Sequence, residues 1–414
     1  MIRIVKLLPV LLFPVVVFAQ NNFRVAGKVI DSATQQPLQG ASVFCQNTTI
    51  GTVTNANGEF QLTLSNGGYD LVVSFMGLET QSIRISNTMP EAADLIIALQ
   101  QKEKSLEEVA IVATNEVANG WEKYGAFLTD NFIGRTVNSK DCEIENPEAL
   151  RFFYSRKRKR LKVTGDSVLV IRNKALGYII KYQLDSFVHE YNNGKTLYAG
   201  YPFYEQMEGS EEEMLVWVEK RKMAYNGSVL QFLRAYHDST LNGDGYKVEL
   251  INDGSTEPSP IYNPYDTVYY DTLGFKRVGL FFPGKLRVVY SKEKPGPVYL
   301  AASKLPMSTP IQISILDLAN GIVVEENGYF FDQKDVLTLG YWAWEKMADF
   351  LPYDYYPNMN TVEEMRARIE EKRTRIEEER VRIEEEMRAK MNSEPEPEKP
   401  EPVEEPAPEE NDLK

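Results

Sequence analysis

Hydrophobic and polar residues alternate over residues 23–98, in short runs separated by glycine and asparagine. The alternation is clearest at residues 60–64 and 83–85, where every second residue is apolar, as in strands with one buried face. Asn57-Gly58 predicts a hairpin, because both turn positions need positive φ. We expect a small seven-stranded antiparallel sandwich over residues 20–100. Its strands are expected at residues 23–31, 41–46, 51–54, 59–64, 69–76, 80–86 and 93–99.

The pattern over residues 119–357 mixes helical and strand periods and predicts an α+β domain. Residues 101–118 are expected to form a linker strand before it. The chain is therefore expected to be mainly β, of the α+β class. Helices are predicted at 121–132, 211–236 and 341–351, the last stopped by Pro352, and strands within 151–204 and 266–340.

Residues 361–392 repeat a charged heptad three times, and we expect a charged helix over residues 358–392. Val362, Ile369, Ile376 and Ile383 lie seven residues apart, but the second core positions include the charged residues Lys372, Glu379 and Glu386. Only half of a coiled-coil seam is present. Glu–Arg pairs at i,i+4 favour a solvated single helix, and a weak coiled-coil oligomer is the alternative.

The net charge of −14 is concentrated at the C-terminal end. Residues 393–414 hold nine acids and two lysines, a charge of −7, and their prolines and glutamates predict a disordered acidic tail. The repeat at 361–392 contributes −1, which leaves −6 for everything before it. This balance does not predict a nucleic-acid partner.

The N-terminus has the pattern of a secretory signal peptide over residues 1–19. A short basic start precedes an apolar run at 7–18, and the small residues Val17 and Ala19 suit a cleavage site. The run is too short to span a bilayer as a helix, although a retained anchor is the alternative. We expect an exported protein, periplasmic or associated with the outer membrane. A disulfide between Cys45 and Cys142 and two separate buried thiols both remain open.

Glycine and apolar positions recur in a specific order in the first domain. This order resembles the carboxypeptidase-regulatory-like domain. The resemblance implies a transthyretin-like β-sandwich in an exported protein of Bacteroidetes type. It also implies an uncharacterised extension after that domain. The residues that carry it are Gly27-x-Val29-x-Asp31, Pro37-Leu38-x-Gly40-Ala41-x-Val43, Gly51-Thr52-x-Thr54-x-x-x-Gly58-x-Phe60-x-Leu62 and Tyr69.

The same domain often precedes outer-membrane receptors. Residues 105–113 resemble the segment that engages the energy-coupling protein TonB in those receptors. A plain linker strand is the alternative for this segment. The roughly 250 residues that follow are too few for the receptor's own barrel.

The family name prompts a search for a metallopeptidase. Such zinc sites use two histidines and a carboxylate, but the chain has only His189 and His237, and neither lies in an HExxH or HxxE motif. No GxSxG, Walker or GxGxxG motif is present. Residues 242–245 begin like a calcium loop without its closing glutamate, so a tight turn is the better interpretation. We expect no enzymatic activity, no cofactor and no metal.

The densest basic cluster is Arg156, Lys157, Arg158, Lys159 and Arg160. Strand alternation would place the three arginines on one face. After export a nucleic-acid partner is not expected, so the functional interpretation is contact with an anionic surface, such as lipid headgroups or lipopolysaccharide phosphates. A solvated hairpin end is the alternative.

Aromatic residues cluster at Tyr201, Phe203 and Tyr204. Exposed rings here would stack on sugars, whereas buried rings would be ordinary strand packing, which we favour. The leading hypothesis is a non-enzymatic exported interaction or scaffold protein of the cell envelope with an envelope protein partner. A carbohydrate-binding module and an accessory to a TonB-dependent outer-membrane receptor are the alternatives.

Overall fold

The computed structural model describes residues 22–102 except 90, 91 and 93, residues 115–357 except 253, 256, 274, 275, 332, 334 and 335, and residues 359–393. The chain divides into two compact units, residues 1–357 and 358–414, which are described separately. The predicted signal peptide, the TonB-like segment at 105–113 and the predicted tail beyond residue 393 lie outside the described residues.

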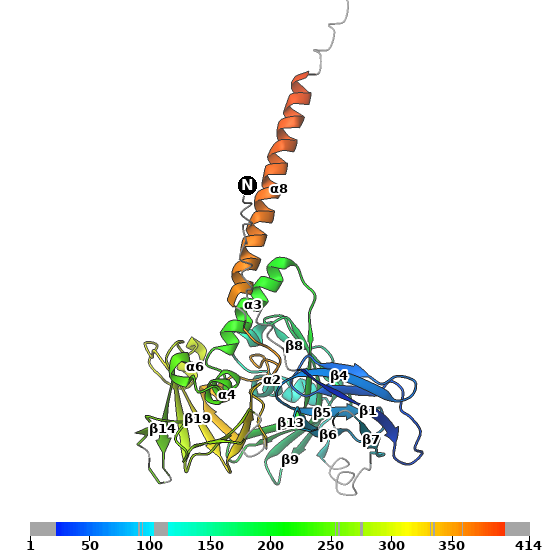
Figure 1. Ribbon diagram of the computed structural model, residues 1–414, viewed down its shortest axis with the longest axis vertical. Helices are drawn as coiled ribbons and strands as arrows, with labels where there is room; N and C mark the ends of the chain where they lie inside the picture. The colour runs from blue at the N-terminus through cyan, green and yellow to red at the C-terminus, as the bar shows by residue number, and fades with distance from the viewer. Residues whose placement is uncertain are drawn as a thin grey trace, which may run out of the picture. The chain divides into compact units, whose positions relative to one another are not determined.

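The first part of unit 1 is a two-layer sandwich with all seven predicted strands (Figure 1, blue). One sheet has the order β4-β1-β7 and the other β3-β2-β5-β6. The predicted alternation is confirmed in β4, where Phe60, Leu62 and Leu64 are buried between exposed neighbours. β1 and β7 pair in parallel, so the expectation of an antiparallel sandwich is wrong for this pair, and the other pairs are antiparallel. The strands are β1 (Asn22–Asp31), β2 (Ser42–Cys45), β3 (Gly51–Val53), β4 (Glu59–Ser65), β5 (Gly68–Ser74), β6 (Gln81–Ser86) and β7 (Leu95–Leu99).

A six-stranded antiparallel sheet follows, built around the long strand β12. The N-terminal half of β12 pairs with β11 and its C-terminal half with β10, while β13 runs along its other edge. The predicted meander at 151–204 is confirmed. The strands are β8 (Cys142–Ile144), β9 (Leu150–Ser155), β10 (Arg160–Gly165), β11 (Leu169–Asn173), β12 (Tyr178–Glu190) and β13 (Lys195–Gln206).

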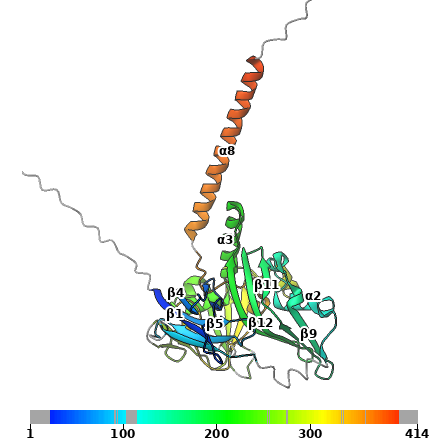
Figure 2. The same ribbon diagram turned by 90° about the vertical axis from the view of Figure 1, so that its right-hand side faces the viewer.

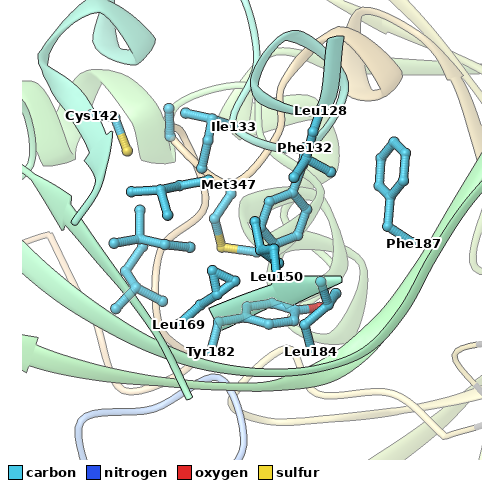
Figure 3. Close-up of a cluster of buried hydrophobic side chains, with 14 of the residues drawn as sticks. Leu128, Phe132, Ile133, Cys142, Leu150, Leu169, Tyr182, Leu184, Phe187 and Met347 are labelled. Carbon is cyan, nitrogen blue, oxygen red and sulfur yellow. The ribbon is translucent and has the colours of Figure 1, made fainter. Parts of the chain in front are cut away.

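Helix α2 (Gly120–Phe132) lies beside this sheet (Figure 2), as predicted at 121–132. Leu128 and Phe132 are fully buried, and the Phe132 ring meets Tyr182 edge-on at 5.1 Å. Figure 3 shows Phe132, Tyr182 and Met347 in this core. The short helix η2 (Asn138–Asp141) connects α2 to β8, and η3 (Pro147–Ala149) connects β8 to β9.

A second hydrophobic core fills the rest of the predicted 119–357 domain. It lies among helix α4, a sheet of order β15-β14-β18-β19-β21 and a sheet of order β16-β17-β20. The predicted strand region at 266–340 is confirmed, but β14 and β15 were not predicted. The strands are β14 (Tyr246–Ile251), β15 (Ser259–Pro260), β16 (Tyr270–Thr272), β17 (Arg277–Leu280), β18 (Lys285–Tyr290), β19 (Gln312–Leu318), β20 (Ile322–Glu325) and β21 (Val336–Gly340).

The helices of this region correct two predictions. The single helix expected at 211–236 is two helices, because Gly227 has a φ of 78° and Ser228 caps a new helix. The helix expected at 341–351 ends at Trp344. Beyond it the N–H groups of Met347 and Ala348 bond to carbonyls at the end of α2 instead of continuing the helix. The helices are α3 (Glu211–Tyr225), α4 (Val229–His237), α5 (Leu241–Asp244), α6 (Pro297–Ala302) and α7 (Tyr341–Trp344).

Unit 2 contains α8 (Met359–Ser393), which confirms the charged helix predicted at 358–392. Arg375 bonds to Glu371 at 3.4 Å, and Arg380 to Glu377 at 3.0 Å. The expectation of a single helix over a coiled coil stays a prediction. Among the described residues, no helix is both long and apolar enough to cross a membrane.

Candidate functional site

The predicted basic cluster forms the turn of a hairpin. Residues 156–159 are the turn between β9 and β10, and all four side chains are exposed. The expected strand alternation is therefore wrong here. The chain turns with Lys159 at a φ of 46°, and the Arg158 N–H donates to Ser155 Oγ at 3.4 Å. A turn points its side chains outward in several directions, not along one strand face.

A second turn, at residues 191–194, lies directly beside the first. The pairing of Arg160 with Glu190 brings the two turns together. The Tyr191 N–H donates to the Lys159 carbonyl at 3.0 Å, and the Arg160 guanidinium pairs with the Glu190 carboxylate at 2.7 Å. We call residues 156–160 and 191–195 together the basic tip.

Aromatic side chains of α2 and the neighbouring strands pack against the basic tip. Tyr191 is 41% exposed, stacks on Phe127 of α2 at 5.7 Å and meets Tyr154 edge-on at 6.1 Å. The ring of His189 lies 4.7 Å from Phe127, and its Nδ1 is 2.7 Å from Thr196 Oγ1. These ring contacts join both hairpins to α2, so the tip stands on a packed base.

The charge of the tip is positive. Arg160 is matched by Glu190, whereas Arg156, Lys157, Arg158 and Lys159 form no ion pair with any described residue. Burial lowers the pKa of His189, so this ring is neutral at pH 7 and adds no charge. Exposed arginine and lysine side chains bind phosphate and carboxylate groups. The tip can therefore hold an anionic partner.

The aromatic residues weighed as a possible sugar platform, Tyr201, Phe203 and Tyr204, lie on β13. Tyr204 is 1% exposed, and its hydroxyl lies 3.9 Å from the Met347 sulfur. Phe203 packs against Phe44 of the sandwich at 5.3 Å, and Tyr201 is half-buried. The burial of Tyr204 and the contact of Phe203 with Phe44 agree with the strand packing favoured from the sequence.

Sandwich residues cover β13. The Asn47 N–H donates to the Pro202 carbonyl at 2.8 Å, and the Tyr204 N–H donates to the Thr48 carbonyl at 2.9 Å. The loop after β2 thus extends the edge of the six-stranded sheet. The two partners in this contact are about 150 residues apart in the chain. No local sequence pattern could therefore predict it.

The histidines do not converge on a metal site. Among the described residues, no three His, Cys, Asp or Glu side chains are grouped as metal ligands. His237 Nδ1 contacts Asp238 at 2.7 Å and Nε2 contacts the Lys276 carbonyl at 2.6 Å. Burial by itself lowers the pKa of His237. The hydrogen bonds to Asp238 and to the Lys276 carbonyl outweigh this effect, so the pKa of His237 is raised.

Two other predicted features have plain structural roles. Residues 241–244 form the one-turn helix α5, closed by Gly245 at a φ of 95°. Cys45 and Cys142 are free and buried, and no bridge joins the sandwich to the next segment. Burial raises the pKa of the Cys142 thiol to about 12, so it is protonated at neutral pH.

The first domain is similar to a known protein family. Residues 25–111 match the family model of the CarboxypepD_reg-like domain. The resemblance seen in the sequence is thereby confirmed for this part of the chain.

Two TonB-dependent receptors carry a similar stretch. SusC of Bacteroides thetaiotaomicron is 36% identical over 100 residues, and P39 of Formosa agariphila is 31% identical over 102 residues. Each match covers 24% of this chain and 9% of the receptor. This chain therefore matches only a small share of either relative's length.

Two solved structures show partial likeness. A protein of unknown function from Bacteroides fragilis NCTC 9343 aligns with 39% of this chain and 65% of its own, at 14% identity and a TM-score of 0.17. A DUF3823 family protein from Bacteroides ovatus ATCC 8483 aligns with 45% of this chain and 81% of its own, at 10% identity and a TM-score of 0.15. TM-scores this low do not indicate a shared overall fold.

Proposed function

We propose that this protein is a non-enzymatic interaction protein of the cell envelope that contacts an anionic lipid surface through its basic tip. The observation that carries the proposal is the turn at residues 156–159, where four consecutive exposed cations lack ion pairs within the described chain. The turn is held by the adjacent hairpin and by the aromatic cluster beneath it. A fixed group of cations suits a surface of repeated phosphate groups.

The envelope location rests on two supports. The first is the predicted signal peptide at residues 1–19, and the second is the similarity of the sandwich region to TonB-dependent receptors. We place the protein in the periplasm or at the outer membrane. The non-enzymatic part of the proposal rests on the sequence, which contains none of the nucleophile, nucleotide or zinc-peptidase motifs considered above.

Vesicle co-sedimentation tests the lipid contact. The full chain is expected to sediment with phosphatidylglycerol vesicles at low salt, to be released as salt screens the charges, and not to sediment with phosphatidylcholine vesicles. The double variant Arg156→Glu, Arg158→Glu is expected to bind more than about tenfold more weakly, since each cation near an anionic surface contributes about 1 kcal/mol.

The matched control is Lys294→Glu, Lys304→Glu. These two exposed lysines lie outside the tip, so the control makes the same change in net charge. It is expected to bind like the wild type. Equal loss in both double variants would show a general charge effect, and equal binding to neutral vesicles would show that the tip does not select anions. Either result contradicts the proposal.

A second candidate function is an accessory to a TonB-dependent receptor. The identities of 36% and 31% to two such receptors over about a quarter of the chain favour it. Cross-linked pull-downs from envelope membranes, with the full chain and with a version lacking residues 361–414, are expected to recover a receptor. Recovery of no receptor above background by either version would remove this candidate.

A further inference from the structure

A concavity of about 600 Å³ lies where α2 begins, between that helix, η3 and β9. The basic tip is formed from different residues. The residues that line the concavity include Trp121, Glu116, Glu122, Glu148 and Arg151. A volume of this size accommodates a small organic ligand or one long side chain of a partner.

Trp121 is positioned as one wall of the concavity. Its ring lies against Gly125 one turn along α2, where an added Cβ would come within 2.8 Å of the indole. Glycine at that position lets the ring lie close to the helix backbone. The side chain is only partly buried, and its Nε1 has no hydrogen-bond partner within the described residues. An aromatic ring with an accessible surface attracts cations through its negative face.

The charges around the ring favour a cation over an anion or a neutral ligand. Arg151 pairs with Asp166 at 2.7 Å and with Glu116 at 3.5 Å, so its charge is already matched. Glu122 and Glu148 form no ion pair with any described residue. The concavity therefore combines Trp121 with two glutamates that have no ion-pair partner among the described residues. Glu122 lies in the first turn of α2, where the helix dipole offsets part of its charge, whereas Glu148 does not. A neutral sugar would leave both charges unmatched, whereas an ammonium or guanidinium group would offset them.

We propose that this concavity binds an organic cation, with the apolar part of the ligand over Trp121 and the charge beside Glu122 and Glu148. The chemistry is that of a lysine or arginine side chain or of a free amine. The site is independent of the basic tip, which takes ligands of the opposite charge.

Calorimetric titration of the full chain tests the proposal with three probes. N-acetyl-argininamide is expected to bind, and N-acetyl-citrullinamide, its neutral analogue, is expected to bind at least about fivefold more weakly. The peptide Gly-Gly-Arg-Gly-Gly, acetylated and amidated, separates the two sources. Tighter binding than the single residue indicates a polypeptide ligand, and equal binding indicates a small cation. Equal binding of the neutral analogue overturns the proposal.

Two variants connect binding to the residues named. Trp121→Ala is expected to lower the affinity about fivefold, and Glu148→Gln is expected to lower it with little risk to folding, because Glu148 is exposed. Glu143→Gln removes the same charge from an exposed position on β8 outside the concavity and is expected to bind normally. If Glu148→Gln and Glu143→Gln both bind as the wild type does, the assignment is wrong.

Discussion

At the residue scale, Arg234 is the clearest case of a buried charge that organises the chain around it. It is 5% exposed and donates to three backbone carbonyls, those of Asn327, Tyr353 and Tyr355, at 2.7–3.0 Å. Its guanidinium also lies 3.9 Å from the centre of the Tyr356 ring. One side chain thus connects α4 to two segments about 90 and 120 residues further along the chain.

Replacing Arg234 with methionine is expected to lower the free energy of unfolding by about 3 kcal/mol. The reason is that three carbonyls, one buried and two partly buried, would lose a charged donor with no replacement. Urea denaturation followed by circular dichroism measures the change. Arg156→Met is the control, because that arginine is exposed on the tip. A similar loss in both variants would mean that the three hydrogen bonds of Arg234 contribute little.

Glu325 is a buried carboxylate whose environment opposes its charge. It is 1% exposed, and its Oε1 has no hydrogen-bond partner among the described residues. Arg277 lies opposite it across the strand pair, and Gly68 of the sandwich packs beside it. Burial raises the pKa of Glu325 to about 7, although the charges of Arg277 and His237 lower it in part.

This raised pKa predicts a pH dependence of stability. The folded state holds the Glu325 proton more tightly than the unfolded state, where the ordinary value is 4.5. The cost of ionising this group is therefore absent below pH 4.5, and it grows to about 3 kcal/mol as the pH rises through 7. The Glu325→Gln variant should match the wild type at pH 4.5 and be more stable at pH 8. Parallel stability curves for the two proteins between pH 4.5 and 8 would contradict this.

At the scale of elements, the starts of α3 and α4 are fixed by local capping residues. Ser210 and Glu213 form a reciprocal capping box that starts α3, and Ser228 caps α4 through the Gln231 N–H. Between the helices, Gly227 at a φ of 78° has Gln312 Oε1 within 2.6 Å of where a Cβ would stand. The break between α3 and α4 therefore depends on the close packing of Gly227 against Gln312 of β19, as well as on the positive φ that glycine allows.

Gly227→Ala is therefore expected to destabilise the protein by about 2 kcal/mol. It combines a strained backbone with a clash against the side chains of Gln312 and Tyr290. Thermal unfolding measures the effect. Gly243→Ala is the matched control, because its φ is not positive and nothing lies within 4 Å of the added methyl group. An equal shift in the two variants would contradict the role given to the fit around Gly227.

The basic tip was partly visible in the sequence. The five cations at residues 156–160 were found, and the alternative of a hairpin end matches their turn in the structure. Alternation alone could not decide between that turn and a strand. The second turn had a local signal in Asn192-Asn193-Gly194 that was not used. The packing of Phe127 against His189 and Tyr191 could not be predicted from local sequence, because α2 meets β12 only in the folded chain.

At the scale of the whole of unit 1, the sandwich is joined to the rest by polar contacts between distant segments. Asn327 Nδ2 donates to the Gly68 carbonyl at 3.0 Å, and the Tyr329 hydroxyl donates to Asp70 at 2.9 Å. Thr49 donates through both its N–H and its hydroxyl to the Asp354 carboxylate. Such an interface should make the sandwich and the body unfold together.

Gly68→Val tests this coupling. An added Cβ would lie 2.5 Å from the Tyr329 ring, so valine is expected to separate the sandwich from the body while suiting a strand by itself. Calorimetry is expected to show one transition for the wild type and two for the variant. Ser82→Val, at an exposed position on β6, is the control and should keep one transition. A single unshifted transition for Gly68→Val would refute the coupling.

The strands of the sandwich and the charged helix α8 follow from the sequence alone, because alternation, turn residues and i,i+4 pairs act over a few neighbouring positions. The covering of Phe203 and Tyr204, the early end of α7 and the need for glycine at 67 and 68 follow only from the tertiary structure. Each depends on a partner more than a hundred residues away, such as Thr48 for Tyr204 or Asn327 for Gly67. Local pattern specifies which segments become strands and helices, and long-range contact decides which of their side chains remain available to a partner.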